Sequence, residues 1–163
     1  MTALRLDIGA GPLRHNGFTT VDAFTDADIR AKMWDLPLAA GTVDEIWSSH
    51  ALEHVPLEQV APTLAEWFRV LREGGTAIIQ VPNLDYACHY WLSHPGETWA
   101  LQIIFGNQAH KGEFHQTGWS PATLRAAIEA AGFVVDRLAV TDDYNQETLR
   151  AEVQKPPCNR KDT

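Results

Sequence analysis

The sequence predicts an α/β fold built on a mainly parallel β-sheet. Short apolar runs typical of strands alternate with a smaller number of amphipathic, helix-like segments along the 163 residues. The last two strand-like runs, 133–140 and 149–153, are separated by a connection too short for a parallel crossover. We therefore expect these two strands to pair as an antiparallel hairpin. Length and composition indicate one domain over residues 1–163.

The first predicted strand leads into a glycine loop. Apolar residues alternate with polar ones over residues 4–8, and Gly9 and Gly11 follow. Because glycine has no Cβ, it adopts positive φ readily and lets a ligand approach the backbone. Asp7 lies at the end of the strand, and ligands of open α/β sheets bind beyond such carboxyl ends. An ordinary βα turn would show the same pattern, so these residues alone leave both interpretations open.

The next three strands follow without an intervening helix. Residues 18–22 form a β-rich run that ends in Asp22. A carboxylate at this position can accept hydrogen bonds from both hydroxyls of a ribose, or it can form an Asx turn or a helix cap. Residues 28–33 predict a short third strand, and residues 43–49 predict a buried fourth strand.

Two helices are expected further along the chain. Apolar residues keep helical spacing over 57–71, where Pro62 must either kink the helix or mark a fresh start. A glycine pair is expected to end this helix before a fifth strand over 76–81. Ser120, followed by proline, is a typical N-cap for a helix over 121–131.

The segment 84–118 differs in kind from the rest of the chain. It is rich in aromatic residues and holds four of the seven histidines, and we expect one helix within it, over 97–105. Long connections inside compact domains are usually lids or binding loops. We therefore predict that this segment is a lid or a substrate-side insertion.

Composition excludes several classes of partner. A net charge of −8 argues against nucleic acid, because phosphates would be repelled. The two cysteines lie far apart and form no metal or redox spacing, which favours a reduced, cytoplasmic setting. The sequence has no signal peptide and no apolar run of about 18 residues, so we expect neither export nor a membrane partner.

Five motifs, occurring in order, carry a family resemblance. They are Leu6–Gly11 (LDIGAG), Val21-Asp22, Asp35–Leu38 (DLPL), Ser49–Val55 (SHALEHV) and Phe68–Gly75 (FRVLREGG), joined later by Gly132-Phe133. Together they resemble the class I S-adenosylmethionine-dependent methyltransferases, in particular the methyltransferase type 11-like group. The resemblance is close over residues 4–81 and moderate over 121–140.

The resemblance implies a Rossmann-like fold. The family has a seven-stranded, mainly parallel sheet in the order 3-2-1-4-5-7-6, with strand 7 antiparallel, which agrees with the hairpin expected above. Its architecture is a three-layer αβα sandwich. Here we expect reduced helix content after the first strand, because the connection from the glycines to Asp22 is short.

The resemblance also implies roles for the acidic and glycine residues near the N-terminus. Asp7 would face the methionine amino group of S-adenosylmethionine or organise water around it. Gly9 and Gly11 would give the cofactor close access to the backbone. Asp22 would hold the ribose hydroxyls. A cationic sulfonium ligand suits a pocket with several carboxylates in an acidic protein.

Three further cofactor contacts follow from the same resemblance. Asp35 would accept a hydrogen bond from the adenine amino group, and Leu36 would pack on the adenine ring. His50 lies where the family places a residue that flanks the methionine or adenine part. The chain begins directly with its first strand. Cover for the substrate is therefore expected from the 84–118 segment or from a second copy of the chain in a homodimer.

Methyl transfer is an in-line displacement at an activated carbon, so alignment is the main task of the enzyme. A general base is needed only where the acceptor must lose a proton. The candidates for this base are His54, His110, His115, Tyr86 and Tyr90. His54 also has a structural interpretation as a cap of the following helix.

The histidine spacing does not favour a metal site. The pairs His89/His94 and His110/His115 are five residues apart, which does not place both rings on one helical face as a spacing of four would. We therefore expect no metal.

The sequence thus predicts a small S-adenosylmethionine-dependent methyltransferase with a small-molecule or sugar-like acceptor. One alternative is a non-catalytic S-adenosylmethionine-binding module that acts as a subunit or sensor. Another keeps the fold but binds a different nucleoside ligand, as aminopropyl transferases and nicotinamide-dependent enzymes do.

Overall fold

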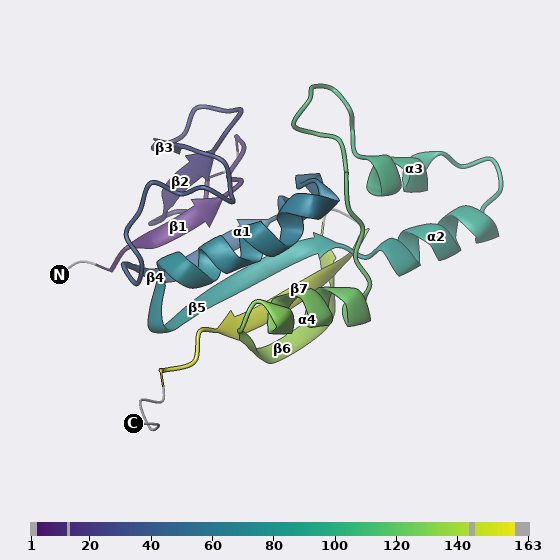
Figure 1. Cartoon of the computed structure of the whole chain (residues 1–163). Coiled ribbons are helices and arrows are strands. Elements are labelled where there is room, and N and C mark those ends of the chain that lie inside the picture. The colour runs from purple at the N-terminus through teal and green to yellow at the C-terminus, as the bar shows by residue number, and fades with distance from the viewer. Residues whose placement is uncertain (1–2, 13, 144–145, 159–163) are drawn as a thin grey trace.

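A single seven-stranded sheet forms the centre of the molecule (Figure 1). The computed structural model describes residues 3–12, 14–143 and 146–158. The strand order is β3-β2-β1-β4-β5-β7-β6, with β7 antiparallel to both of its neighbours and the other pairs parallel. The predicted order and the predicted C-terminal hairpin are both confirmed. The turn of the hairpin, at 144–145, lies outside the described residues.

The strands agree with the expected runs, with two differences in length. They are β1 (Arg5–Ile8), β2 (Thr19–Asp22), β3 (Ile29–Arg30), β4 (Val43–Ser49), β5 (Leu71–Pro82), β6 (Val134–Asp143) and β7 (Gln146–Gln154). The third strand is only two residues long, because little of the 28–33 run pairs with β2. The fifth strand is longer than expected and includes the glycine pair, which therefore does not end the preceding helix.

Four α-helices and one 3₁₀ turn complete the fold. They are η1 (Leu52–His54), α1 (Leu57–Val70), α2 (Leu84–Ser93), α3 (Trp99–Phe105) and α4 (Pro121–Ala130). Helix α1 runs through Pro62 as one element. Helix α2 was not expected from the sequence, where 84–96 was assigned only to the lid. None of the described helices is long and apolar enough to cross a membrane.

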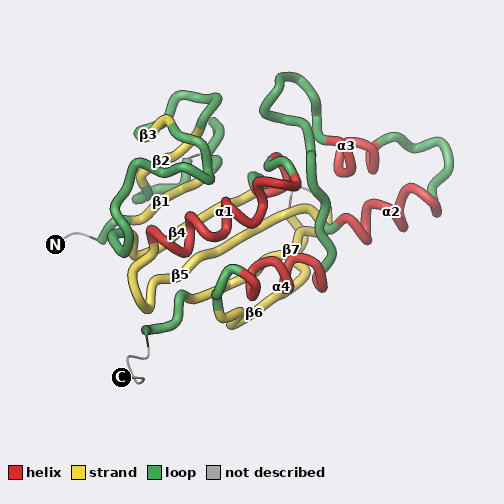
Figure 2. Tube along the Cα trace, viewed as in Figure 1, coloured by secondary structure: helices red, strands yellow, loops and turns green. Residues whose placement is uncertain are grey.

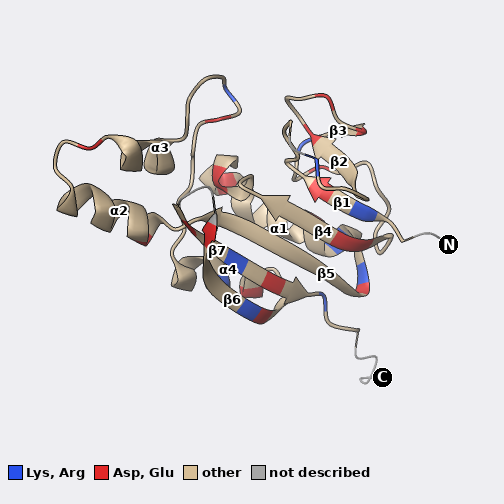
Figure 3. Cartoon of the chain, turned by 180° about the vertical axis from the view of Figure 1, so that it is seen from behind, with Lys and Arg blue, Asp and Glu red and all other residues tan. Residues whose placement is uncertain are grey.

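The reduced helix content expected after the first strand is confirmed, and it leaves two layers among the described residues in place of the three that the family resemblance implies. Helices α1 and α4 cover one face of the sheet, and no helix lies over the other face when the molecule is seen from behind (Figure 3). The short connections between β1 and β2 and between β2 and β3 leave no room for the missing helices.

The uncovered face has the polar surface that such a position requires. Arg5 on β1 forms an ion pair with Glu45 on β4 (3.4 Å), and Arg150 pairs with Glu152 on β7 (3.2 Å). The opposite face of the same strands carries the hydrophobic core, where Trp67 of α1 is fully buried. Polar side chains on one face and a hydrophobic core on the other are typical of a sheet with one solvated face.

Helices α2 and α3 do not pack on the sheet. They extend from its edge, beyond the carboxyl ends of the parallel strands (Figure 2). The segment returns to the sheet through a bridge between Asn83 and Trp119, where the Leu84 amide donates to the Trp119 carbonyl (2.9 Å). The insertion is therefore anchored at both ends beside the same strand edge.

The capping box of α4 provides a test of local stability. The Ser120 side chain accepts from the Thr123 amide (3.2 Å), and the Thr123 hydroxyl accepts from the Ser120 amide (2.9 Å). Ser120→Ala should lower the free energy of unfolding by about 1 kcal/mol in urea denaturation, because two helix-end donors lose their arrangement. Ser93→Ala, at an exposed position outside the caps of α4, is the control and should change it far less.

Candidate functional site

Two adjoining cavities form a continuous cleft at the carboxyl edge of the sheet. The larger has a volume of about 710 Å³ and the smaller about 280 Å³. Both volumes together are ample for a small organic ligand. The cavities share a set of lining residues: Gly9, Gly11, Pro12, His50, His54 and Glu113.

The topology explains why the cleft lies here. The chain goes from β1 outward to β2 and β3, then returns to place β4 on the other side of β1. The connections that leave β1 and β4 therefore separate at their carboxyl ends, and a crevice opens between them. The larger cavity lies over β4, β5 and the α3 segment, and the smaller lies over the ends of β2 and β3.

The glycine loop after β1 forms the floor shared by both cavities. Gly9 has φ +73° and Gly11 has φ +55°. A Cβ on Gly9 would overlap the Cβ of Ala51, so this glycine is required by packing against the segment that follows β4. A Cβ on Gly11 would meet no atom within 4 Å. The open space for a ligand is thus at Gly11, and Gly9 brings the two strand ends together.

Asp7 lies in the larger cavity and is almost fully buried, with 4% of its surface exposed. Its Oδ2 accepts from the His15 amide (2.9 Å). Burial raises the pKa of Asp7, and the His15 amide offsets only part of that effect. The His15 ring stacks on Trp47 with 4.4 Å between centroids, so an aromatic wall stands beside the carboxylate.

Asp22 lies in the smaller cavity at the end of β2. Its Oδ1 accepts from the amides of Phe24 (2.7 Å) and Thr25 (2.8 Å), and its Oδ2 accepts from the Gly11 amide (3.1 Å). Burial acts to raise the pKa of Asp22, but these amides outweigh it and lower the pKa. The carboxylate forms the Asx turn that the sequence left open, and Oδ2 keeps a further acceptor site toward the cavity.

Asp35 and Leu36 are not brought to the cleft. Asp35 is exposed and pairs through its backbone with Lys32, and neither Asp35 nor Leu36 lines the two cavities. Leu36 is buried in the hydrophobic core. In the structure it is Lys32, beside Phe24 (4.5 Å from Nζ to the ring centroid), that faces the smaller cavity.

The turn after β4 carries the most unusual residues of the cleft. His50 has φ +51°, a backbone conformation that is strained for a residue with a Cβ, and its amide donates to the Gln80 carbonyl (2.9 Å). Three residues later Glu53 is 1% exposed. Among the described residues, neither of its carboxylate oxygens has a hydrogen-bond partner, and His50 Nδ1 lies 3.5 Å from Oε1.

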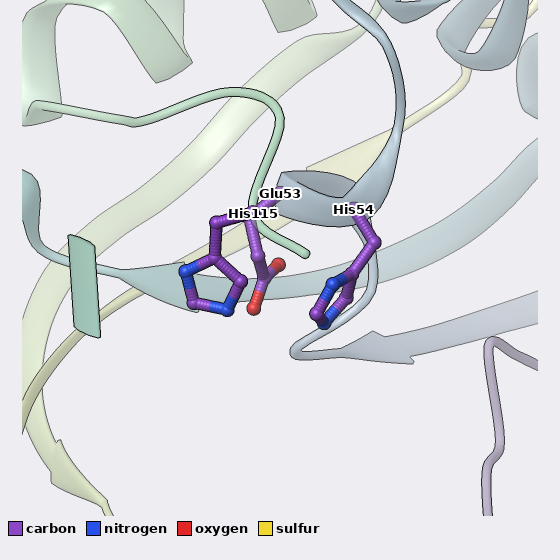
Figure 4. Close-up of side chains that lie close together, drawn as sticks. All are labelled: Glu53, His54 and His115. Atoms are coloured by element: carbon purple, nitrogen blue, oxygen red, sulfur yellow. The ribbon is translucent and has the colours of Figure 1, made fainter. Parts of the chain in front are cut away.

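Three imidazoles surround the Glu53 carboxylate. Burial acts to raise the pKa of Glu53, but His50, His54 and His115 outweigh it and lower the pKa. Burial lowers the pKa of His115 despite the neighbouring carboxylate. The rings of His54 and His115 meet edge to face at 4.8 Å, and Figure 4 shows the carboxylate between them.

The 84–118 segment is tied to this turn by backbone hydrogen bonds. The amides of Gln116 and Thr117 both donate to the Glu53 carbonyl (2.8 and 3.1 Å). His54 Nδ1 contacts the Phe114 carbonyl (3.1 Å), and His115 Nδ1 contacts the Ile103 carbonyl (2.7 Å), so Nε2 of each ring is the nitrogen left for a proton or a ligand. Segments about 60 positions apart therefore meet at one point, and both histidine rings are held in place.

The remaining base candidates lie elsewhere. His110 is exposed, lines the smaller cavity and contacts Glu113 (3.3 Å between Nε2 and Oε1). Tyr90 donates to Glu97 (2.7 Å), and neither Tyr86 nor Tyr90 lines the two cavities. Of the predicted bases, His54 and His115 are thus the two that line the larger cavity.

Sequence reasoning gave no role to several residues that the structure brings to the cleft. Glu53 is the clearest case, and the available signal was a charged residue placed directly after Leu52 and before Val55, both buried. Trp47 appeared only as the centre of a strand, and Lys32 only as part of one. Their positions on the uncovered face and at the end of β3 are set by pairing between distant segments.

Comparison with known families identifies part of this chain. Residues 6–79 match the family described as Methyltransferase domain. No curated protein sequence matches the chain.

Solved structures share the fold over nearly the whole length. A S-adenosylmethionine-dependent methyltransferase from Methanosarcina mazei has a TM-score of 0.69 at 15% identity, covering 96% of this chain and 95% of that one. The 1,6-didemethyltoxoflavin-N1-methyltransferase of Burkholderia thailandensis, solved with 1,6-didemethyltoxoflavin and S-adenosylhomocysteine, scores 0.67 at 16% identity (94% and 71%). A methyltransferase described as putative, from Haloferax volcanii in complex with the Trm112 activator, scores 0.64 at 21% identity (94% and 82%). At these identities the likeness establishes the fold.

The two glycines provide a matched test of the loop. Gly9→Ala and Gly11→Ala both place a Cβ at positive φ, which costs about 1–2 kcal/mol. Gly9→Ala should cost at least about 1 kcal/mol more, because its Cβ overlaps Ala51 and the packed strand ends must shift. Urea denaturation of both variants measures the difference, and equal losses would contradict the packing role of Gly9.

Asp7→Asn tests the buried carboxylate. Because the folded pKa of Asp7 is raised, its ionised form costs stability above that pKa, and the cost disappears as the pH falls through it and the group is protonated. The variant should therefore be at least as stable as the wild type near neutral pH, with the difference shrinking at mildly acidic pH. Thermal unfolding across this range measures it. Asp136→Asn, at an exposed position, is the control.

Proposed function

We propose that this chain is an S-adenosylmethionine-dependent methyltransferase of the type 11 group and that it transfers the methyl group of that cofactor to a small molecule. The match of residues 6–79 to a methyltransferase domain and the shared fold support this. The cofactor lies across both cavities. Its adenosine occupies the smaller cavity, and its methionine and methyl group reach the larger one. The part of the cofactor that joins these two ends passes over the Gly11 backbone. The continuous cleft around the glycine loop is the observation that carries this proposal.

The smaller cavity suits an adenosine. Asp22 Oδ2 accepts a hydrogen bond from the Gly11 amide and can accept another from a ribose hydroxyl. Phe24, Met33 and Trp34 give the same cavity apolar and aromatic surface for a purine ring. Asp35 and Leu36, the adenine contacts that the family resemblance implies, are not needed for this arrangement.

The larger cavity suits the cationic half of the cofactor. S-adenosylmethionine carries a sulfonium and an ammonium group, and Asp7 supplies a buried carboxylate on the cavity wall. Because a raised pKa marks a carboxylate that lacks a cationic partner, ligand binding would relieve the strain at Asp7.

The same cavity leaves room for an acceptor beside the methyl group. Helix α3 and the following segment form its outer wall, with Trp99, Gln102 and Asn107 facing it. A small aromatic or polar molecule fits such a lining. The Burkholderia neighbour, whose structure holds a small heterocyclic ligand and S-adenosylhomocysteine, supports this class of acceptor.

The chemistry asks for alignment more than for activation. The acceptor atom attacks the methyl carbon in line with the carbon–sulfur bond, and the bonding pair leaves with sulfur to give neutral S-adenosylhomocysteine. Correct alignment can supply about 7–11 kcal/mol of the barrier reduction. Where the acceptor must lose a proton, His54 and His115 are the candidates on the wall of the larger cavity.

Asp22→Ala should weaken S-adenosylhomocysteine binding by about 1–3 kcal/mol in titration calorimetry, because a charged acceptor for the ribose is lost. Asp26→Ala is the matched control, because it removes a fully exposed carboxylate from the same loop, and it should bind as the wild type does. Equal affinity of both variants would remove Asp22 from the site.

Transfer of a tritiated methyl group to candidate acceptors tests the activity itself. Tight binding of S-adenosylhomocysteine with no labelled product from any acceptor would favour a binding module instead of an enzyme. Among the described residues, no helix covers one face of the sheet (Figure 3), and this is the feature that favours the second candidate.

A further inference from the structure

The turn after β4 and the end of the lid place a carboxylate and two imidazoles together. One ligand atom from each of Glu53, His54 and His115 lies within 4.8 Å of the other two. All three residues line the larger cavity. We propose that these three side chains bind a divalent transition-metal ion.

The carboxylate requires a cation that the surrounding protein supplies only in part. Glu53 is 1% exposed, and within the described chain neither of its oxygens accepts a hydrogen bond. The ion pair with His50 is long, at 3.5 Å. A buried carboxylate without good partners is costly, and coordination of a metal ion is one of the two usual ways in which proteins compensate this cost.

Both imidazoles are prepared as ligands. A carbonyl oxygen only accepts, so His54 must donate through Nδ1 to Phe114, and His115 must donate through Nδ1 to Ile103. Each ring then presents the lone pair of Nε2. Metal-binding histidines almost always donate their other ring nitrogen to a carbonyl or carboxylate, which fixes both tautomer and orientation.

The geometry is open but close to that of a metal centre. With metal–ligand distances of about 2.0–2.2 Å, neighbouring ligand atoms lie about 3–3.5 Å apart. In the structure these atoms lie within 4.8 Å of one another, so small rotations of the side chains would bring them to this separation. The two segments that carry the side chains are already joined at the Glu53 carbonyl. Two nitrogens and one oxygen favour zinc, cobalt, manganese or iron over magnesium, which prefers oxygen ligands.

Three protein ligands leave a coordination position open toward the cavity, as in catalytic metal sites. If the proposed function holds, this open coordination position selects an acceptor with a hydroxyl group. His54 and His115 would then serve as metal ligands and not as bases. The metal would bind the hydroxyl oxygen and lower its pKa, and the proton would pass to solvent water. The oxygen then attacks the methyl carbon, the carbon–sulfur pair goes to sulfur, and a methyl ether and S-adenosylhomocysteine result.

The test measures metal binding directly. The chain is treated with chelator, dialysed and titrated with Co²⁺, followed by visible absorption, and then with Zn²⁺ and Mg²⁺ by calorimetry. The wild type should bind one equivalent of Co²⁺ or Zn²⁺, and Mg²⁺ far more weakly. Glu53→Gln keeps the shape of the side chain and should weaken binding at least 100-fold, as should His115→Ala.

Two controls make the result decisive. His89→Ala removes an exposed histidine from α2 and should bind the metal as the wild type does. Circular dichroism and S-adenosylhomocysteine titration check that Glu53→Gln is folded and still binds the cofactor, so that loss of metal is separated from failure of the proposed function. Absence of Co²⁺ and Zn²⁺ binding, or binding that Glu53→Gln and His115→Ala leave unchanged, would overturn the proposal. The second result would assign Glu53 to positioning His50 instead.

Discussion

The backbone carbonyl of Glu53 is the point on which the site depends. It accepts hydrogen bonds from the amides of Gln116 and Thr117, and so joins a turn at the sheet edge to a segment about 60 positions later. This junction places His115 opposite the Glu53 side chain and closes the larger cavity on that side. Without it, the cleft would be an open edge of parallel strands, with the β4 turn exposed.

The one-sided sheet gives this junction its importance. In a three-layer sandwich, helices on both faces help to hold the strand connections in place. Here helices α1 and α4 cover only one face, and the other is solvated by ion pairs such as Arg5–Glu45 (Figure 3). The positions at the carboxyl edge are therefore held by local contacts. These are the close packing of Gly9 against Ala51, the amides that donate to Asp22, and the hydrogen bonds from the 84–118 segment.

The sequence was sufficient for features that depend on near neighbours along the chain. Alternation over 4–8 and the buried run over 43–49 predicted two central strands, and the short final connection predicted the hairpin. The family motifs predicted the strand order. Helix α2 was not predicted, because it depends on packing against α3. The short connection after the first strand predicted reduced helix content there, although the family resemblance implied a third layer that the described residues lack. The smaller-cavity role of Lys32, in place of Asp35, depends on how the chain turns after a two-residue strand.

The grouped histidines show why spacing rules fail for such a site. The rule that pairs His110 with His115, or His89 with His94, assumes that both ligands belong to one helix. The set in the structure combines consecutive residues of a 3₁₀ turn with one residue of a distant loop. Because a 3₁₀ turn has about three residues per turn, Glu53 and His54 point in different directions, and only a second segment can enclose the space between them. The end of the 84–118 segment is that second segment. The hydrogen bonds from the amides of Gln116 and Thr117 to the Glu53 carbonyl therefore determine where His115 lies.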